Sequence, residues 1–111
     1  MTEIPFRVEA SATPGVAPLE YELAADDRVR LTARLGERPT GGYSVVVTRI
    51  TRRGPRLQIE CVIGRPEPGA IVTQVLTSPA QTVSIDGALV RGIRDAVLLD
   101  PSGAQLARIS A

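Results

Sequence analysis

Few side chains in this sequence are of a type that could perform catalysis. There is no histidine and no lysine, so the most common general base and the Schiff-base nucleophile are both absent. The single cysteine, Cys61, alternates with Ile59 and Ile63 in a strand-like run. This position predicts a small buried hydrophobic side chain rather than a nucleophile. We therefore expect no catalytic residues and a protein that is not an enzyme.

Metal binding would have to rely on carboxylates alone. Asp26 and Asp27 are adjacent, and Glu67 lies in a segment rich in proline and glycine. Both settings are typical of turns, and neither shows the ligand spacing of a calcium or magnesium site. A carboxylate pair for glycoside hydrolysis has nothing in the sequence to favour it. We expect no metal and no cofactor.

Four arginines, Arg49, Arg52, Arg53 and Arg56, gather in one predicted hairpin. A phosphate-binding patch would fit this charge, but no aromatic side chain is interleaved for stacking on bases. The net charge is only +1, because twelve acidic residues accompany thirteen arginines. The pattern favours a solvated hairpin tip that discourages strand pairing at the sheet edge over a nucleic-acid or anionic-membrane partner.

The strongest candidate for a binding site is a short loop between two strand-like runs. Its residues are Arg38, Pro39, Thr40, Gly41, Gly42 and Tyr43. Pro39 fixes its own φ and keeps Arg38 out of the helical region. Gly41 and Gly42 allow positive φ, so the chain can turn sharply before the next strand. The sequence predicts a loop that is held in one shape.

This loop is longer than a tight connection requires. Two glycines would suffice for a hairpin, and ordering the three preceding residues costs conformational entropy. A contact with another molecule would offset that cost, although a purely structural loop remains the alternative. Under the binding interpretation, Arg38 supplies a charged hydrogen bond and Tyr43 an apolar anchor.

The elements that would hold the loop are predominantly strands. Alternating or β-branched runs, separated by proline, glycine and aspartate every 8 to 12 residues, predict eight or nine short strands. The expected strands cover residues 4–10, 19–23, 29–35, 43–51, 57–63, 70–77, 81–85, 97–99 and 106–109, with a short helical turn within 88–96. The run 43–51 is β-branched on both faces, which predicts a central strand. We expect a single all-β domain over residues 1–111: an antiparallel β-sandwich of immunoglobulin-like type, or alternatively a small β-barrel.

The sequence does not determine the cellular location of the protein. No apolar run approaches the roughly 18 residues of a membrane span. Residues 1–5 lack the basic and then apolar profile of a signal peptide, so the chain is either cytosolic or begins after a removed export signal. One cysteine excludes an internal disulfide and leaves the redox compartment open.

Two blocks of sequence resemble a known family. The first runs from Gly36 to Ser44 and contains the Arg38–Tyr43 loop; the second is Pro68-Gly69 followed by residues 72–79 (VTQVLTSP). Together they resemble the C-terminal domain of the protease complex subunit PrcB, over about Leu31 to Ile85. The resemblance implies a small β domain, typically exported, that is associated with a bacterial surface protease.

Gln74, Thr77 and Ser78 in the second block form a secondary candidate patch. Alternatively, this block keeps the sheet together through a buried glutamine amide that bonds to backbone.

The loop also shows a more distant similarity to the chagasin-type inhibitors of cysteine proteases. Those immunoglobulin-like domains insert an Asn-Pro-Thr-Thr-Gly loop into the enzyme cleft. Pro39, Thr40, Gly42 and Tyr43 match that loop, whereas Arg38 replaces its asparagine and Gly41 its second threonine. The similarity implies a protease-inhibitor-like use of the loop.

These observations lead to one expected function and two alternatives. We expect a non-enzymatic protein-binding module, protease-associated or protease-inhibitor-like, that uses the 38–43 loop on a partner protein. The first alternative is a structural envelope domain that self-associates as a homodimer through a sheet edge. The second is a carbohydrate- or nucleic-acid-binding β-sandwich. From the PrcB resemblance we expect an exported or cell-envelope protein.

Overall fold

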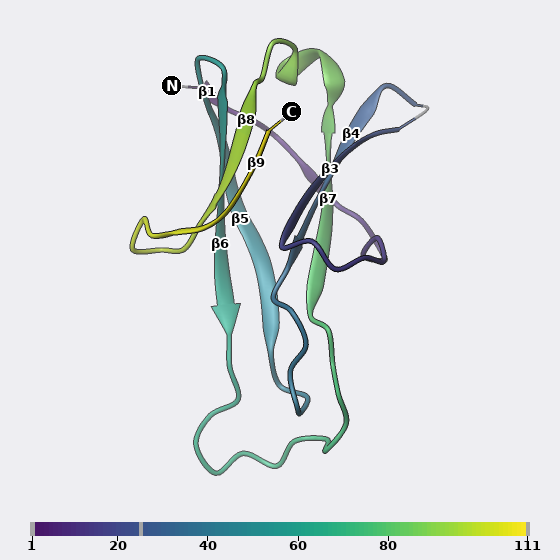
Figure 1. Ribbon diagram of the computed structural model, residues 1–111, viewed down its shortest axis with the longest axis vertical. Coiled ribbons are helices and arrows are strands. Elements are labelled where there is room, and N and C mark those ends of the chain that lie inside the picture. The colour runs from purple at the N-terminus through teal and green to yellow at the C-terminus, as the bar shows by residue number, and fades with distance from the viewer. Residues whose placement is uncertain (1, 25, 111) are drawn as a thin grey trace.

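The computed structural model describes residues 2–24 and 26–110, which form nine strands in two packed sheets (Figure 1). The first sheet has the order β1-β5-β6-β8-β9. Its strands are β1 (Thr2–Glu3), β5 (Ser44–Arg53), β6 (Arg56–Gly64), β8 (Asp95–Leu99) and β9 (Gln105–Ser110). The second sheet has the order β2-β7-β4-β3. Its strands are β2 (Arg7–Val8), β7 (Ala80–Asp86), β4 (Arg28–Arg34) and β3 (Leu19–Leu23).

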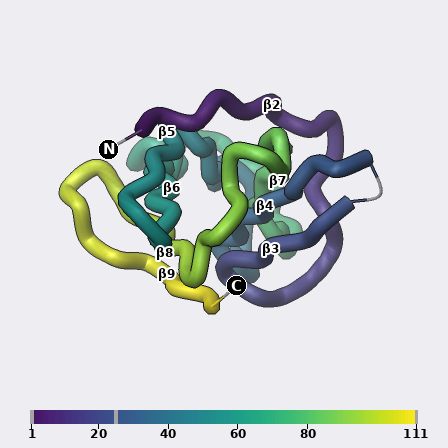
Figure 2. Tube along the Cα trace, turned by 90° about the horizontal axis from the view of Figure 1, so that it is seen from above, coloured from purple at the N-terminus to yellow at the C-terminus, as the bar shows by residue number. Residues whose placement is uncertain are grey.

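The core lies between the two sheets, which are seen end-on in Figure 2. Alternate residues of the long strands point inward, apart from one irregularity in β5, and the inward side chains are almost all aliphatic. The buried set includes Leu31 and Ile85 from the second sheet and Ile50, Leu57 and Ile59 from the first. The predicted β-sandwich is confirmed, and in the described residues the two sheets do not close into the barrel considered as the alternative.

One pair of neighbouring strands departs from the antiparallel arrangement that the sequence predicted. β6 and β8 pair in parallel, with Arg56 opposite Asp95 and Glu60 opposite Leu99. The chain leaves β6, returns along β7 in the other sheet, and crosses back through the 3₁₀ turn η1 (Gly87–Val90) (Figure 1). Since β7 reverses the direction in between, β8 runs the same way as β6.

The predicted helical turn is confirmed as η1. Within the described residues no helix has the length and apolar character to cross a membrane.

The strand predicted over residues 4–10 is wrong as a single element. Within it only β2 is a strand, β1 precedes it in the other sheet, and Pro5 lies between the two. Pro5 has no N–H to donate to a ladder, so pairing stops there and the chain passes from one sheet to the other. Ile4 is buried at this crossing and its backbone N–H donates to the Ile50 carbonyl at 2.8 Å.

The strand predicted over residues 70–77 is also wrong. The segment belongs to the long connection from β6 to β7, and its only ladder contact is an isolated bridge between Arg38 and Thr77. Its β-branched side chains are suited to strands, but that preference reflects packing against neighbours. Ile71 is fully exposed, so such packing is missing there.

β5 is not buried on both faces as its composition predicted. Val45 and Val47 point into the core, whereas Val46 is 44% exposed. A β-bulge between Val47 and Arg49 shifts the alternation by one residue, so that Ile50 points inward next. Gln81 on β7 secures this region, because its Oε1 accepts from the Val47 N–H at 2.8 Å and so links the two sheets.

The carboxylate of Asp95 joins three strands of the first sheet. It accepts from Arg56 Nη2 on β6 at 2.8 Å and pairs with Arg108 Nη2 on β9 at 3.1 Å. The Arg56 hydrogen bond, helped by the positive charges of Arg56 and Arg108 and opposed by partial burial, holds the pKa of Asp95 below its usual value. The charged form is therefore favoured in the folded protein.

The depressed pKa of Asp95 predicts a loss of stability in acid. A carboxyl whose folded pKa lies below its unfolded pKa stabilises the fold fully above the unfolded value of about 4 and loses that contribution as pH falls toward the folded pKa. Thermal melts of Asp95→Asn should therefore show a weaker dependence of Tm on pH below about pH 4 than the natural chain. Some slope should persist, because hydrogen bonds led by the Ser102 hydroxyl also lower the pKa of Asp100. Identical slopes would contradict the assignment.

Candidate functional site

Two loops meet at one end of the sandwich, opposite the end that carries η1 (Figure 1). One is the predicted binding loop between β4 and β5, and the other is the connection between β6 and β7. The second loop runs beneath the first from one sheet to the other (Figure 1). The structure thus places the 38–43 loop and the secondary patch of Gln74, Thr77 and Ser78 at the same end of the molecule.

Hydrogen bonds join these loops along their length. Arg38 and Thr77 exchange both backbone hydrogen bonds, at 2.8 and 2.9 Å. The Gly41 N–H donates to the Thr73 carbonyl at 2.9 Å, and the Thr77 hydroxyl donates to the Thr40 carbonyl at 2.8 Å. Four bonds between two otherwise irregular segments hold the 38–43 loop in a fixed shape. The fixed shape predicted from Pro39 is present, and much of it comes from the neighbouring loop.

The two glycines are required by this close approach. A Cβ on Gly41 would collide with the Thr73 hydroxyl. Gly42 has φ +90°, and a Cβ there would lie 2.9 Å from Pro66 Cβ and 3.1 Å from Val72 Cγ1. Gly41 is therefore needed for its lack of a side chain, and Gly42 for that and for its positive φ.

Arg38 and Tyr43 contact each other across the loop. The Arg38 guanidinium carbon lies 5.6 Å from the centre of the Tyr43 ring, within the range of a cation–π contact. Arg38 Nη1 also donates to the Glu37 carbonyl at 3.3 Å. Both side chains are half-buried, while Pro39 and Gly42 beside them are exposed. The pair presents a cationic and an aromatic group at the end of the sandwich.

The three residues of the secondary patch differ in their setting: one is structural and two are exposed. Thr77 is half-buried and holds the loops together, whereas Gln74 and Ser78 are exposed. The alternative of a buried amide at Gln74 is therefore wrong. Gln81, seven residues later, is half-buried and makes an amide-to-backbone bond instead. Both glutamines lie in or beside β-branched runs, so local pattern does not distinguish them.

An exposed apolar group on the second loop was missed because its residues were assigned to a strand. Ile71 is fully exposed, Leu76 is 69% exposed and Val75 is 57% exposed. Large apolar side chains exposed on the same loop are candidates for an interaction site. We call residues 38–43 together with Ile71, Val75 and Leu76 the base surface.

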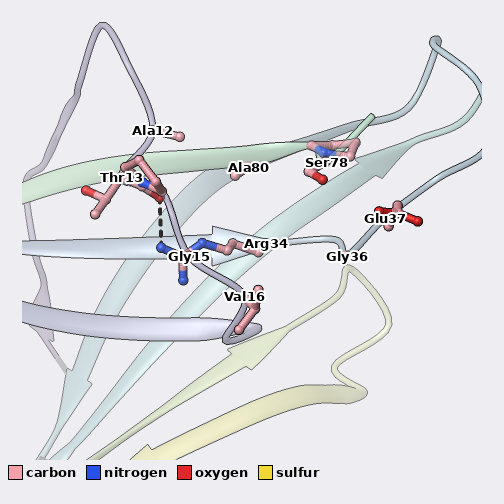
Figure 3. Close-up of a pocket in the computed structure, with 11 residues that line it drawn as sticks. Ala12, Thr13, Gly15, Val16, Arg34, Gly36, Glu37, Ser78 and Ala80 are labelled. Atoms are coloured by element: carbon pink, nitrogen blue, oxygen red, sulfur yellow. Dashed lines mark hydrogen bonds between the residues drawn. The ribbon is translucent and has the colours of Figure 1, made fainter. Parts of the chain in front are cut away.

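A cavity of about 440 Å³ lies near the base surface, on the outer side of the second sheet (Figure 3). The segment before β3 covers it, and Arg34 at the end of β4 forms its inner wall. The Arg34 side chain is only 6% exposed. Its Nη1 donates to Glu20 Oε1 at 2.6 Å and to the Ala17 carbonyl at 3.0 Å, and Nη2 donates to the Thr13 carbonyl at 2.8 Å.

The face of β4 that alternates with the core residues Leu31 and Ala33 is also buried near the end of the strand. Thr32 and Arg34 are buried because residues 13–18 fold over them, and the Thr13 N–H donates to the Thr82 hydroxyl at 2.8 Å. Gly15 lies against the guanidinium, where a Cβ would approach Arg34 Cζ to 2.8 Å. We call Arg34 and its hydrogen bonds to Glu20, Ala17 and Thr13 the Arg34 clamp. The cavity forms where residues 13–18 fold over this clamp.

The described residues hold few groups suited to catalysis. Cys61 is 1% exposed, and burial, with a contribution from the negative charge of Asp100, raises the pKa of its thiol. A raised pKa keeps the sulfur protonated and unreactive. Across residues 2–24 and 26–110, no three His, Cys, Asp or Glu side chains gather as a metal site.

A comparison with protein-family models matches residues 31–86, half of the chain, to the family described as PrcB C-terminal. The matched segment begins in β4 and ends with β7, so it contains the whole base surface. The comparison with curated proteins found no match. The comparison with solved structures found none either. On the family match, the chain belongs to the PrcB C-terminal family.

Proposed function

We propose that this domain is a non-enzymatic protein-binding module that associates with a protease through the base surface. The observation that carries the proposal is the full exposure of Ile71 on a segment whose backbone is fixed by hydrogen bonds. Exposing a large apolar side chain on an ordered segment has no benefit for the isolated fold. Because the segment is already ordered, binding would cost little further conformational entropy.

The chemistry of the surface suits a protein partner. Ile71 and Leu76 would fill apolar hollows on the partner, and Tyr43 would add an aromatic anchor. Arg38 has donors left over after its bond to the Glu37 carbonyl, and these would meet a partner carbonyl or carboxylate. Membership of a family named for a protease complex subunit supports a protease as that partner and supports an exported or cell-envelope location.

Site-specific cross-linking tests the proposal in the producing cell. A photoreactive amino acid replaces Ile71 in one variant and Leu23 in the other. Leu23 is a matched control, because it is 71% exposed and lies at the end of β3 far from the base surface. We expect a protease adduct from position 71 alone. Adducts with a second copy of this chain would instead favour self-association, and equal adducts from both positions would overturn the proposal.

A substitution at Ile71 measures how much this side chain contributes to protease affinity. Ile71→Asp should weaken binding of the cross-linked protease by about tenfold to a hundredfold, because burying this side chain is worth about 1.5–3 kcal/mol. Leu23→Asp should leave the affinity unchanged. Peptidase activity measured with and without the domain would show whether association also inhibits. Equal affinities for the two variants would exclude the base surface as the contact.

A further inference from the structure

A second cavity opens between the two sheets beside the base surface. Its volume is about 330 Å³, at the lower end of the range of about 300–1,000 Å³ for ligand pockets. Four strands of the first sheet provide its apolar wall: Val45 on β5, Cys61 and Ile63 on β6, Leu98 on β8 and Leu106 on β9. Leu106 is 42% exposed at the mouth, while Cys61 and Leu98 are buried.

Among the described residues, the charged side chains that line this cavity are all cationic. Three arginines line it, Arg34, Arg38 and Arg65, and no carboxylate among the described residues does so. Arg34 is already neutralised by Glu20. Neither Arg38 nor Arg65 belongs to any ion pair formed within residues 2–24 and 26–110. Two uncompensated guanidinium groups beside an apolar wall are complementary to a ligand that is apolar at one end and anionic at the other.

We propose that this cavity binds the carboxyl-terminal residue of a partner polypeptide that ends in an aliphatic side chain. The side chain would lie on the wall between Val45 and Leu106, and the terminal carboxylate would bond to Arg38 and Arg65. A volume of this size holds one such residue, whereas a long acyl chain needs more room. Because Arg38 belongs to both sites, a protein docked on the base surface could place its end here. The inference thus deepens the proposed function by naming a segment of the partner.

Isolated peptides test this inference without the protease. A fluorescein-labelled peptide, Gly-Ser-Gly-Ala-Ala-Leu, is titrated with the domain as the free acid and as the C-terminal amide, and fluorescence anisotropy is measured. The free acid should bind about tenfold or more tightly than the amide, because the amide cannot form the charge-assisted bonds. Equal affinities, or no binding of the acid, would overturn the inference.

Variants at the mouth of the cavity locate the binding. Leu106→Asp, which places a like charge beside the ligand, should abolish acid binding. Leu89→Asp is its matched control, since Leu89 is 39% exposed on η1 at the opposite end, and it should bind normally. Arg65→Gln should weaken binding about tenfold, and Arg91→Gln at the η1 end should not. If a cavity variant and its control change peptide affinity equally, in either pair, the peptide does not bind in this cavity.

Two further measurements separate this inference from its alternatives. Octanoate offers the same carboxylate on a free acyl chain. Weaker competition by octanoate than by unlabelled peptide supports the peptide, and stronger competition would overturn it. Ile71→Asp should leave peptide binding intact even where it removes protease binding, so failure of the proposed function and failure of this inference give different results.

Discussion

Arg34→Met is expected to lower the free energy of unfolding by about 3 kcal/mol, the largest effect that we expect from a substitution outside the aliphatic core. Breaking a buried ion pair typically costs about 3–5 kcal/mol, because the remaining partner is left uncompensated. Here the Glu20 side chain is 42% exposed and can be rehydrated, which places the loss at the lower end of that range. The carbonyls of Thr13 and Ala17 also lose their donors. Urea denaturation followed by circular dichroism measures the change.

Two further variants separate the contribution of charge from that of the hydrogen bonds in the Arg34 clamp. Arg34→Lys keeps a positive charge but cannot bond to Glu20 and both carbonyls at once, so it should lie between the natural chain and Arg34→Met. Glu20→Gln keeps an acceptor for Arg34 Nη1 and should cost less than Arg34→Met. A loss below about 1 kcal/mol for Arg34→Met would mean that the guanidinium is replaceable by packing alone.

Gly42→Ala is expected to cost about 2–3 kcal/mol, more than its backbone conformation alone, and to disturb the base surface. A residue with a side chain pays about 1–2 kcal/mol for a left-handed conformation. The new methyl group would also press on Pro66 and Val72, and overpacking of this kind costs about 1–3 kcal/mol before relaxation. Since the second loop would have to move away, the hydrogen bond from Gly41 to Thr73 should weaken. Protease affinity should therefore fall with stability.

Gly36→Ala is the matched control for that substitution. Gly36 has φ +84°, but a Cβ there would meet nothing within 4 Å. The variant should show the cost of the backbone conformation, about 1–2 kcal/mol, without displacement of the second loop. Equal losses of stability and of protease affinity in the two variants would show that the contact between the loops is dispensable.

The fold class could be predicted from sequence because the core obeys a simple alternation. Val29, Leu31 and Ala33 recur at every second position, and the same pattern marks Leu57, Ile59 and Cys61. Burying one face of such strands requires a second sheet, which leads to a sandwich. The 38–43 loop was predicted from Pro39 and the two glycines, whose backbone preferences act locally.

The remaining features depend on contacts that are distant in sequence. The run 70–77 has the composition of a strand, but it forms a β-bridge with the neighbouring loop only at Thr77. Arg34 is buried because a segment about twenty residues earlier covers it. The parallel pairing of β6 with β8 depends on the route of the chain through the other sheet. Local pattern contains none of this information, so the exposed group at Ile71 could not be found from sequence.

Hydrogen–deuterium exchange of the domain, alone and bound to the cross-linked protease, measures the contact surface most directly. We predict slower exchange on binding for amides within residues 38–43 and 71–77, and unchanged exchange in the hairpin of β3 and β4 at the other end. Protection confined to that hairpin or to β9, with none in the base surface, would contradict the account.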